Sequence, residues 1–219
     1  MDESTSREKI LKKVRAALMN KSRQEIPGID FESNIFTSGD DPLELVFAQQ
    51  FSDAGGQFVF CENEEEFFYN IQALTSDDTF GKIWCGEQEL AQSLIAAGMN
   101  ILTGDEELVA ADTSITSCEY LIARTGSIAL SSKQASGRRS GVHPDHHIVV
   151  ARTSQLVYHV KDALKELKTK YPDNGPSLIS FITGPSRSAD IEKTLIQGAH
   201  GAKEIYLFLI DDLMTGETF

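Results

Sequence analysis

Apolar and polar positions alternate along the chain between short strand-like runs and stretches with helical spacing. Apolar runs predict strands at residues 57–61, 82–85, 100–102, 147–151 and 205–210. Apolar residues three and four apart predict helices that begin at residue 41 or 42, at 64 and at 88, and another helix that Ser154 caps. Because strands that alternate with helices build layered sheets, we expect an α/β fold with helices on both faces of a three-layer sheet.

Two more apolar runs, at residues 121–123 and 128–130, flank the segment Arg124-Thr-Gly-Ser127. They are interpreted either as two strands joined by a tight turn or as one strand broken by a bulge. The four intervening residues are too short to be a phosphate-loop signature on their own.

The C-terminal segment combines an apolar run, a loop and a helical pattern. Residues 177–182 predict a strand, Thr183-Gly-Pro-Ser186 a loop, and the spacing of Ile191, Leu195 and Ala199 a helix. With the strand predicted at 205–210, this order predicts a parallel βαβ unit whose loop lies beyond the carboxyl end of a strand. Ligands of such sheets bind there.

The same segment predicts an anion site, because a helix N-terminus presents free N–H groups and a positive dipole. Arg187 lies beside this point, and Asp190 and Glu192 would lie in the first helical turn. The alternative is structural: helix caps and a local cluster of Arg187 with carboxylates that fix the loop.

Residues 131–147 form a basic loop in an acidic protein, with Lys133, Arg138 and Arg139 near the flexible backbone of Gly137. Two arginines on such a loop can hold a carboxylate or phosphate, although a mobile surface loop explains the composition equally well. His143, His146 and His147 are spaced along an extended stretch, which disfavours a metal site; none is predicted. His147 is either an acid–base residue or a residue at a strand edge.

Charge is distributed unevenly along the 219 residues. The net charge is −13, but residues 1–23 carry +4 and the remainder −17. The acidic body argues against nucleic acid as a partner. We therefore predict an N-terminal helix and linker at residues 1–40, followed by one domain at 41–219. The apolar face of the basic helix packs either on its own domain or on a neighbouring subunit of a homo-oligomer.

The chain has no apolar run long enough to span a membrane and no signal-peptide pattern, so a cytoplasmic protein is expected. Its three cysteines, Cys61, Cys85 and Cys118, are far apart, and two of them end strand-like runs. Buried, reduced thiols are expected, and no iron–sulfur cluster or zinc site held by this chain alone.

Three sequence blocks together resemble the LUD domain family, and the resemblance covers nearly the full length. The most specific is Gly184-Pro-Ser-Arg-Ser-Ala-Asp-Ile-Glu192 with Gly198-Ala-His-Gly201; the others are Thr125-Gly-Ser-Ile-Ala-Leu130 and Gly137-Arg138 with His147-Ile148. The resemblance implies a fold like that of NagB, RpiA and CoA transferases. It also implies a role in bacterial oxidation of L-lactate to pyruvate, with two cysteine-rich partner proteins that carry the iron–sulfur clusters.

The resemblance assigns no catalytic residue. Relatives often have an acidic residue before the Thr-Gly motif, where this chain has Arg124, and this difference argues against a glutamyl-thioester mechanism at that position. We expect the two loops to meet over the carboxyl ends of the sheet, with Arg187 and Arg138 or Arg139 holding an anion and His147 or Asp190 moving a proton. The remaining expected ligand-binding positions come from the motifs: Thr125, Gly126, Ser127, Gly137, Gly184, Pro185, Ser186, Glu192 and His200.

Two alternatives to a lactate-oxidising subunit remain open. One is a free-standing enzyme that uses ATP or an acyl-thioester, like the folate cyclo-ligase and transferase relatives of this fold. The other is an assembly or regulatory module that performs no chemistry.

Overall fold

The computed structural model describes residues 5–19, 41–137, 139–189, 195–198 and 200–213. The chain divides into two units, Met1–Ser38 and Gly39–Phe219. In the first, the predicted helix is present as α1 (Ser6–Met19). Thr5 and Glu8 form a reciprocal cap at its start, and Ile10, Leu11 and Val14 are exposed.

A six-stranded sheet forms the centre of the second unit. Its strands, in spatial order, are β1 (Gln57–Cys61), β12 (Glu204–Ile210), β7 (His146–Arg152), β4 (Thr113–Ser117), β2 (Ile83–Trp84) and β3 (Ile101–Leu102). All neighbouring strands are parallel. The α/β fold with a central sheet is therefore confirmed, and this main sheet fixes where the loops lie.

Helices α3 (Glu64–Thr75) and α4 (Gln88–Ala96) cover one face of the main sheet. Phe67 and Ile71 of α3 and Leu94 of α4 are buried against Ile115, Ile148 and Phe208 of the sheet. These apolar positions recur three or four residues apart along each helix, so burying the stripe stabilises the layer.

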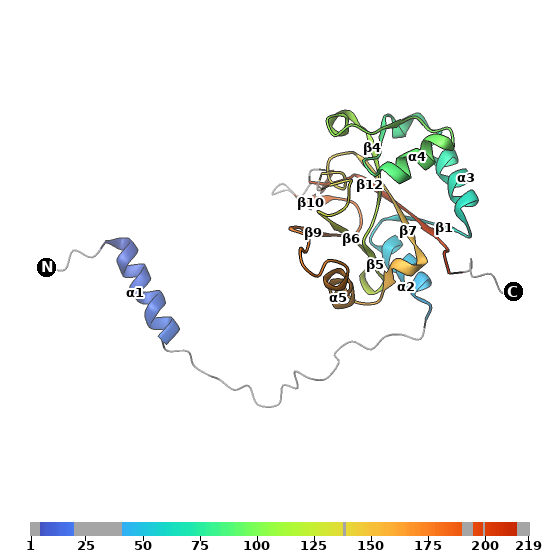
Figure 1. Ribbon diagram of the computed structural model, residues 1–219. Coiled ribbons are helices and arrows are strands. Elements are labelled where there is room, and N and C mark those ends of the chain that lie inside the picture. The colour runs from blue at the N-terminus through green and yellow to red at the C-terminus, as the bar shows by residue number, and fades with distance from the viewer. Residues whose placement is uncertain (1–4, 20–40, 138, 190–194, 199, 214–219) are drawn as a thin grey trace. The chain divides into compact units, whose positions relative to one another are not determined.

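The opposite face is covered by α2 (Leu43–Asp53) and a second, four-stranded sheet. The strand order in this second sheet is β8 (Leu156–Val157), β5 (Tyr120–Ile122), β6 (Ser127–Ser131) and β9 (Ile179–Ile182). Phe47 and Phe51 of α2 pack with Leu121 and Ile128 against Leu207 of β12. Helix α5 (Val160–Lys170) covers the far side of the second sheet, through Ala163. Figure 1 shows α5 and α4 on opposite sides of the domain.

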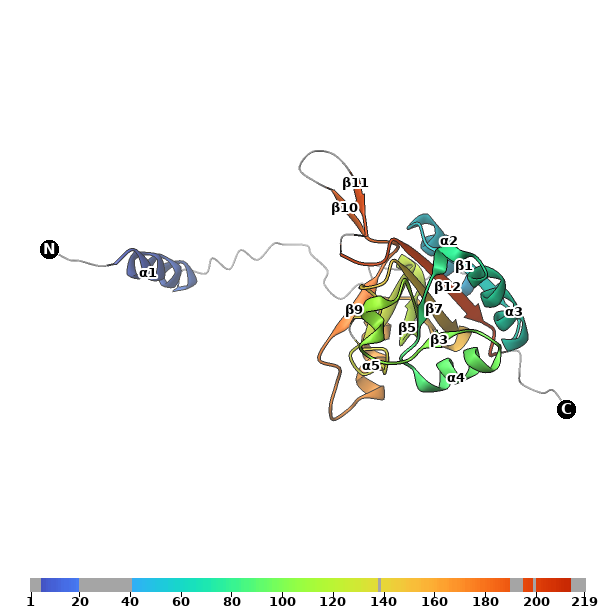
Figure 2. The ribbon, with the colours of Figure 1, turned by 90° about the horizontal axis from the view of Figure 1, so that it is seen from above.

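Two predictions of secondary structure are wrong at the C-terminal segment. The helix predicted from the spacing of Ile191, Leu195 and Ala199 is wrong at Leu195, because β10 (Arg187–Ala189) and β11 (Leu195–Gln197) form an antiparallel hairpin, which projects from the domain in Figure 2. Ile191 and Ala199 lie outside the described residues. The predicted parallel βαβ unit is also absent, because β9 pairs antiparallel with β6 in the second sheet, whereas β12 lies in the main sheet.

Two smaller differences concern the middle of the chain. Residues 121–122 and 128–130 lie in two separate antiparallel strands, β5 and β6, joined at the short 3₁₀ turn Ala123–Thr125, which settles the choice between a turn and a bulge. Ser154 does not cap a helix: residues 153–157 form a 3₁₀ turn and β8, and α5 begins at Val160 with a capping box of His159 and Asp162.

Candidate functional site

The Gly-Pro-Ser loop and the end of the basic loop lie at the amino-terminal edge of the main sheet, whereas the start of the basic loop, at Gln134 and Ala135, lies at the carboxyl-terminal edge. Asp145 immediately precedes β7, and its carboxylate pairs with Lys203, which immediately precedes β12, at 2.6 Å. The Ser186 amide donates to the Ala202 carbonyl at 2.9 Å, next to the same strand end. For the Gly-Pro-Ser loop, the expectation of a carboxyl-edge location is wrong because β9 belongs to the second sheet, so its end leads to the opposite edge.

The Thr-Gly-Ser turn and the Gly-Pro-Ser loop are joined by a chain of hydroxyls. Ser127 Oγ lies 2.7 Å from Thr125 Oγ1 and 2.7 Å from Thr183 Oγ1. Ser127 is buried, whereas Thr183 is exposed. The structure thus brings together Thr125, Ser127 and Thr183. The hydrogen bond between Ser127 and Thr183 joins residues that are 56 positions apart in the sequence.

Two glycines of these motifs are required by close approach to the end of α2. Gly126 has φ +58°, and a Cβ atom there would come within 2.7 Å of the Gln50 carbonyl oxygen. Gly184 has φ +74°, and a Cβ atom would lie 3.0 Å from the Ala54 carbonyl carbon. Both backbone conformations favour glycine, so these residues shape the site by allowing three segments to touch.

Arg187 extends over the turn that follows α2. A Cβ atom at Gly55 would overlap Nη2 of Arg187 and lie 3.5 Å from both its Cζ and the Cδ of Pro185. Among the described residues, the ion pairs are Arg152–Glu64, Lys170–Glu119 and Lys203–Asp145, and none involves Arg187. This exposed guanidinium therefore presents positive charge and several donors at the end of α2, the segment that Gly126 and Gly184 also approach.

Ser186 fixes the base of the hairpin that carries Arg187. Its carbonyl accepts from the Gly198 amide at 3.1 Å, and its hydroxyl accepts from the His200 amide at 3.4 Å. His200 is exposed. Ser186 and His200 thus meet, although they are 14 residues apart.

The basic loop is tied down mainly through its backbone. The Arg139 carbonyl accepts from the amides of Val142 and His143, and its side chain is exposed. Gly137 has φ +72° with nothing within 4 Å of a Cβ position. Arg138, Asp190 and Glu192, predicted to hold the anion or move a proton, lie outside the described residues.

His147 is fully buried between the two sheets. Its Nε2 lies 2.9 Å from Thr116 Oγ1, while Nδ1 has no partner among the described residues. Burial lowers the pKa of the imidazole to about 4. Because Nδ1 lacks an acceptor, the Nε2–H tautomer is the favourable one. A proton transfer from this ring to an external ligand would require the loop before β7 to move away.

The carboxyl-terminal edge of the main sheet carries a large cavity that sequence reasoning missed. It has a volume of about 690 Å³. The last residues of β4, β7 and β12 line it, together with the first turns of α3 and α4. The sequence did hold a signal for this cavity, because polar residues come soon after apolar runs. Glu87 follows the strand predicted at 82–85, and Arg152 follows the strand predicted at 147–151.

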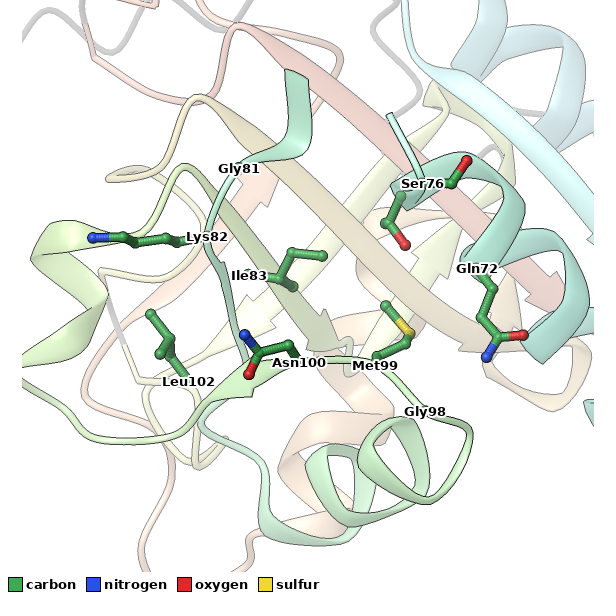
Figure 3. A pocket seen from close by; sticks show the side chains of 10 residues that line it. Gln72, Ser76, Gly81, Lys82, Ile83, Gly98, Met99, Asn100 and Leu102 are labelled. Atoms are coloured by element: carbon green, nitrogen blue, oxygen red, sulfur yellow. The ribbon is translucent and has the colours of Figure 1, made fainter. Parts of the chain in front are cut away.

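A smaller hollow of about 430 Å³ lies at the amino ends of β2 and β3. Figure 3 shows Gln72 of α3 and Ser76, which follows that helix, across from Ile83 and Met99, with Lys82 extending away from them. Lys82 is the one acidic or basic side chain among its lining residues. The hollow therefore offers little for acid–base chemistry.

The cysteines are buried and free, as predicted. Burial raises the pKa of Cys85 to about 12 and also raises the pKa values of Cys61 and Cys118. Within the described part of the chain, no cluster of His, Cys, Asp and Glu side chains could hold a metal ion. No helix in the described residues is long and apolar enough to cross a membrane.

The domain is an α/β protein in which a second sheet packs on a parallel main sheet. A Gly-Pro-Ser loop contacts the turn that follows α2. Residues 102–210 match the LUD domain. A lactate utilization protein C from Bacillus licheniformis is 32% identical over 174 residues, which cover 77% of this chain and 68% of that protein. The chain belongs to the LUD domain family.

Two further comparisons show how far the similarity extends along the chain. A lactate utilization protein C from Halalkalibacterium halodurans is 35% identical over 109 residues, 49% of this chain, and the match spans about half of that relative, 47% of its length. A crystal structure of a DUF162 family protein from Deinococcus radiodurans has a TM-score of 0.57 at 21% identity, covering 77% of this chain and 96% of that one. At this identity the likeness shows the fold alone.

Proposed function

We propose that this chain is a subunit of a cytoplasmic iron–sulfur complex that oxidises L-lactate to pyruvate, and that it binds a small carboxylate or phosphate group at residues 183–188. The metabolic part is supported by the relatives named lactate utilization protein C. The ligand part is carried by one observation: the exposed Arg187 guanidinium and two glycines next to the Thr125–Ser127–Thr183 hydroxyl chain, Gly126 and Gly184, all approach the same segment at the end of α2. An anion there would accept hydrogen bonds from the guanidinium and from the hydroxyl chain.

The anion site is tested by replacing Arg187 with Gln, with exposed Lys168 of α5 replaced by Gln as the matched control. We expect R187Q to weaken binding of lactate and of inorganic phosphate, measured by NMR titration, and to slow growth on L-lactate in a strain that lacks the native gene. K168Q should leave both unchanged. Unaltered binding and growth in R187Q, with an unchanged thermal unfolding curve, would remove this site assignment.

The redox centres of the proposed complex would lie on two cysteine-rich partners, because the cysteines of this chain are buried with raised pKa values. A thiolate is the form that ligates iron. Co-expression with candidate partners should give a complex whose iron content is unaffected when all three cysteines here are replaced by Ala or Ser. Loss of iron in that variant, with the complex intact, would contradict the assignment.

An assembly role without chemistry is the second candidate, and the β10–β11 hairpin favours it. The hairpin forms its own two-stranded sheet and pairs with neither of the larger sheets. Replacing residues 188–196 with a short Gly-Ser turn should leave the domain folded while abolishing co-purification with the cluster-bearing partners. Under the free-standing ATP or thioester alternative, the purified chain would turn over substrate with no partner present.

A further inference from the structure

The cavity at the carboxyl-terminal edge lies where the order of strands in the main sheet changes direction. From β2 the chain moves outward to β3, whereas from β4 it moves the opposite way to β7 and then β12. Crevices outside the carboxyl ends of strands at such a switch point are the usual ligand sites of open α/β sheets. Here the crevice is lined by Glu87 after β2 and Ser117 at the end of β4.

The lining of this carboxyl-edge cavity combines an apolar surface with hydrogen-bonding groups. Apolar side chains come from both helices and two central strands: Phe67, Phe68, Leu90, Val150 and Ile210. Neutral polar side chains complete the lining: Gln88, Ser93, Ser117, Gln134 and Gln155. A volume of about 690 Å³ falls within the range of cofactor and nucleoside pockets. The composition suits a polar ring system better than a hydrocarbon or a small ion.

Two carboxamides hold the mouth of the cavity in place. Gln155 donates to the Cys118 carbonyl at 2.6 Å and accepts from the Arg152 amide at 2.7 Å. Gln134 donates to Ser117 Oγ at 3.1 Å and accepts from the Ser131 amide at 2.9 Å. The walls are thus formed before any ligand arrives, which lowers the entropy cost of binding.

The charges around the cavity disfavour anions. Its two basic residues are already paired, Arg152 with Glu64 at 2.6 Å and Lys170 with buried Glu119 at 2.7 Å. Glu87 accepts from the Ser117 amide, and Glu89 is exposed at the rim. Two carboxylates therefore remain without a cationic side-chain partner among the described residues, and they repel a phosphate.

We propose that this cavity binds an uncharged or cationic heteroaromatic molecule of nucleoside size and rejects phosphorylated forms of it. The ring packs on the apolar side chains of α3, α4 and the central strands, while the rim carboxylates exclude negative charge. The cavity lies at the opposite edge of the main sheet from the Arg187 site. The proposed heteroaromatic site and the proposed anion site can therefore be tested independently of each other.

Adenosine, AMP and ATP are the probes that test this proposal, with binding measured by calorimetry and saturation-transfer NMR on the full chain. Adenosine should bind, AMP at least about tenfold more weakly, and ATP more weakly still. Leu90→Trp fills the cavity and should abolish adenosine binding. Ile95→Trp, on an exposed position of the same helix, should not.

A second variant keeps the test independent of how well Leu90→Trp folds. Glu89→Gln removes one rim charge and should narrow the difference between adenosine and AMP, whereas Glu166→Gln on exposed α5 should leave it unchanged. The proposal is overturned if adenosine does not bind at millimolar concentration, if ATP binds more tightly than adenosine, or if folded Leu90→Trp protein binds adenosine normally.

Discussion

The two edges of the main sheet differ in how they are built. At the amino-terminal edge, backbone segments touch directly: Gly126 and Gly184 lie against the end of α2, and the motif side chains form a surface with an exposed arginine. At the carboxyl-terminal edge, side chains keep the segments apart and enclose about 690 Å³. The most specific sequence motifs therefore mark the tightly packed edge, while a ligand-sized cavity of about 690 Å³ lies at the other.

A specific motif and a cavity therefore arise from different physical requirements. Close backbone contact requires glycine at particular positions and leaves a strong sequence signature. A cavity requires only that side chains of suitable size stop short of each other, which many residue types satisfy. We therefore expect substitutions of the closely packed glycines at the amino edge to act on folding, and substitutions of the side chains that line the cavity at the carboxyl edge to act mainly on ligands.

The largest expected effect is at Gly126. Substitution by Ala places a Cβ against the backbone of Gln50 and Phe51 at a positive φ, so we expect a loss of more than about 3 kcal/mol in the free energy of unfolding. Gly137→Ala, also at positive φ but with open space around it, should cost about 1 kcal/mol. Urea unfolding measures both. Equal losses would show that the contact with α2 is unimportant.

The next effect is a pH dependence from His147. Its pKa is about 4 in the folded protein against 6.5 unfolded, so the unfolded state binds a proton first as the pH falls. Stability contributed by the neutral ring should decline between pH 6.5 and 4 by roughly 3 kcal/mol. His147→Gln should remove this part of the slope in unfolding curves, and exposed His143→Gln should not. An unchanged slope in His147→Gln would mean that another group titrates.

A smaller loss is expected at Glu119, beneath the carboxyl edge. Its buried carboxylate accepts hydrogen bonds from Ser131 Oγ, Lys170 Nζ and Tyr171 Oη. Glu119→Gln keeps the shape but weakens these charge-assisted bonds, which should cost about 2 kcal/mol in unfolding free energy. Exposed Glu166→Gln is the control. A neutral result would indicate that Ser131 and Tyr171 find other partners.

The smallest effect is expected at Arg152, whose ion pair with Glu64 is largely exposed. Arg152→Met should change stability by less than about 0.5 kcal/mol, because solvent screens such pairs. A loss of unfolding free energy above about 1 kcal/mol would show that the Arg152–Glu64 pair also holds the mouth of the cavity in shape, in addition to balancing its charge.

The central strands and the helices beside them were predictable because their residues bury continuous apolar runs or stripes. Strand β4 was not predicted, since Thr113, Ser114 and Thr116 are polar by sequence yet fully buried. Each hydroxyl has a partner: the Phe80 carbonyl, the Ser140 carbonyl and His147 Nε2, respectively. Such compensation depends on distant segments and leaves no local pattern.

The candidate site was half predictable for a similar reason. The motifs singled out both Thr125 to Ser127 and Thr183 to Arg187, but the contact that the structure shows between Ser127 and Thr183 was not predicted. The helix predicted after them failed because Leu195, at helical spacing from Ile191, belongs to a strand of the hairpin. The edge was misplaced because no local signal tells which of two sheets a strand joins.

The chain passes repeatedly between the two sheets: β4 in the main sheet, β5 and β6 in the second, β7 in the main, β8 and β9 in the second, then β12 in the main. The segment that matches the LUD domain, residues 102–210, contains β4, β7 and β12 but not the neighbours β2 and β1. Expressed alone, it would expose an unpaired edge on each side of those three strands and would aggregate. The stretch that matches the LUD domain is therefore shorter than the stretch that completes the main sheet.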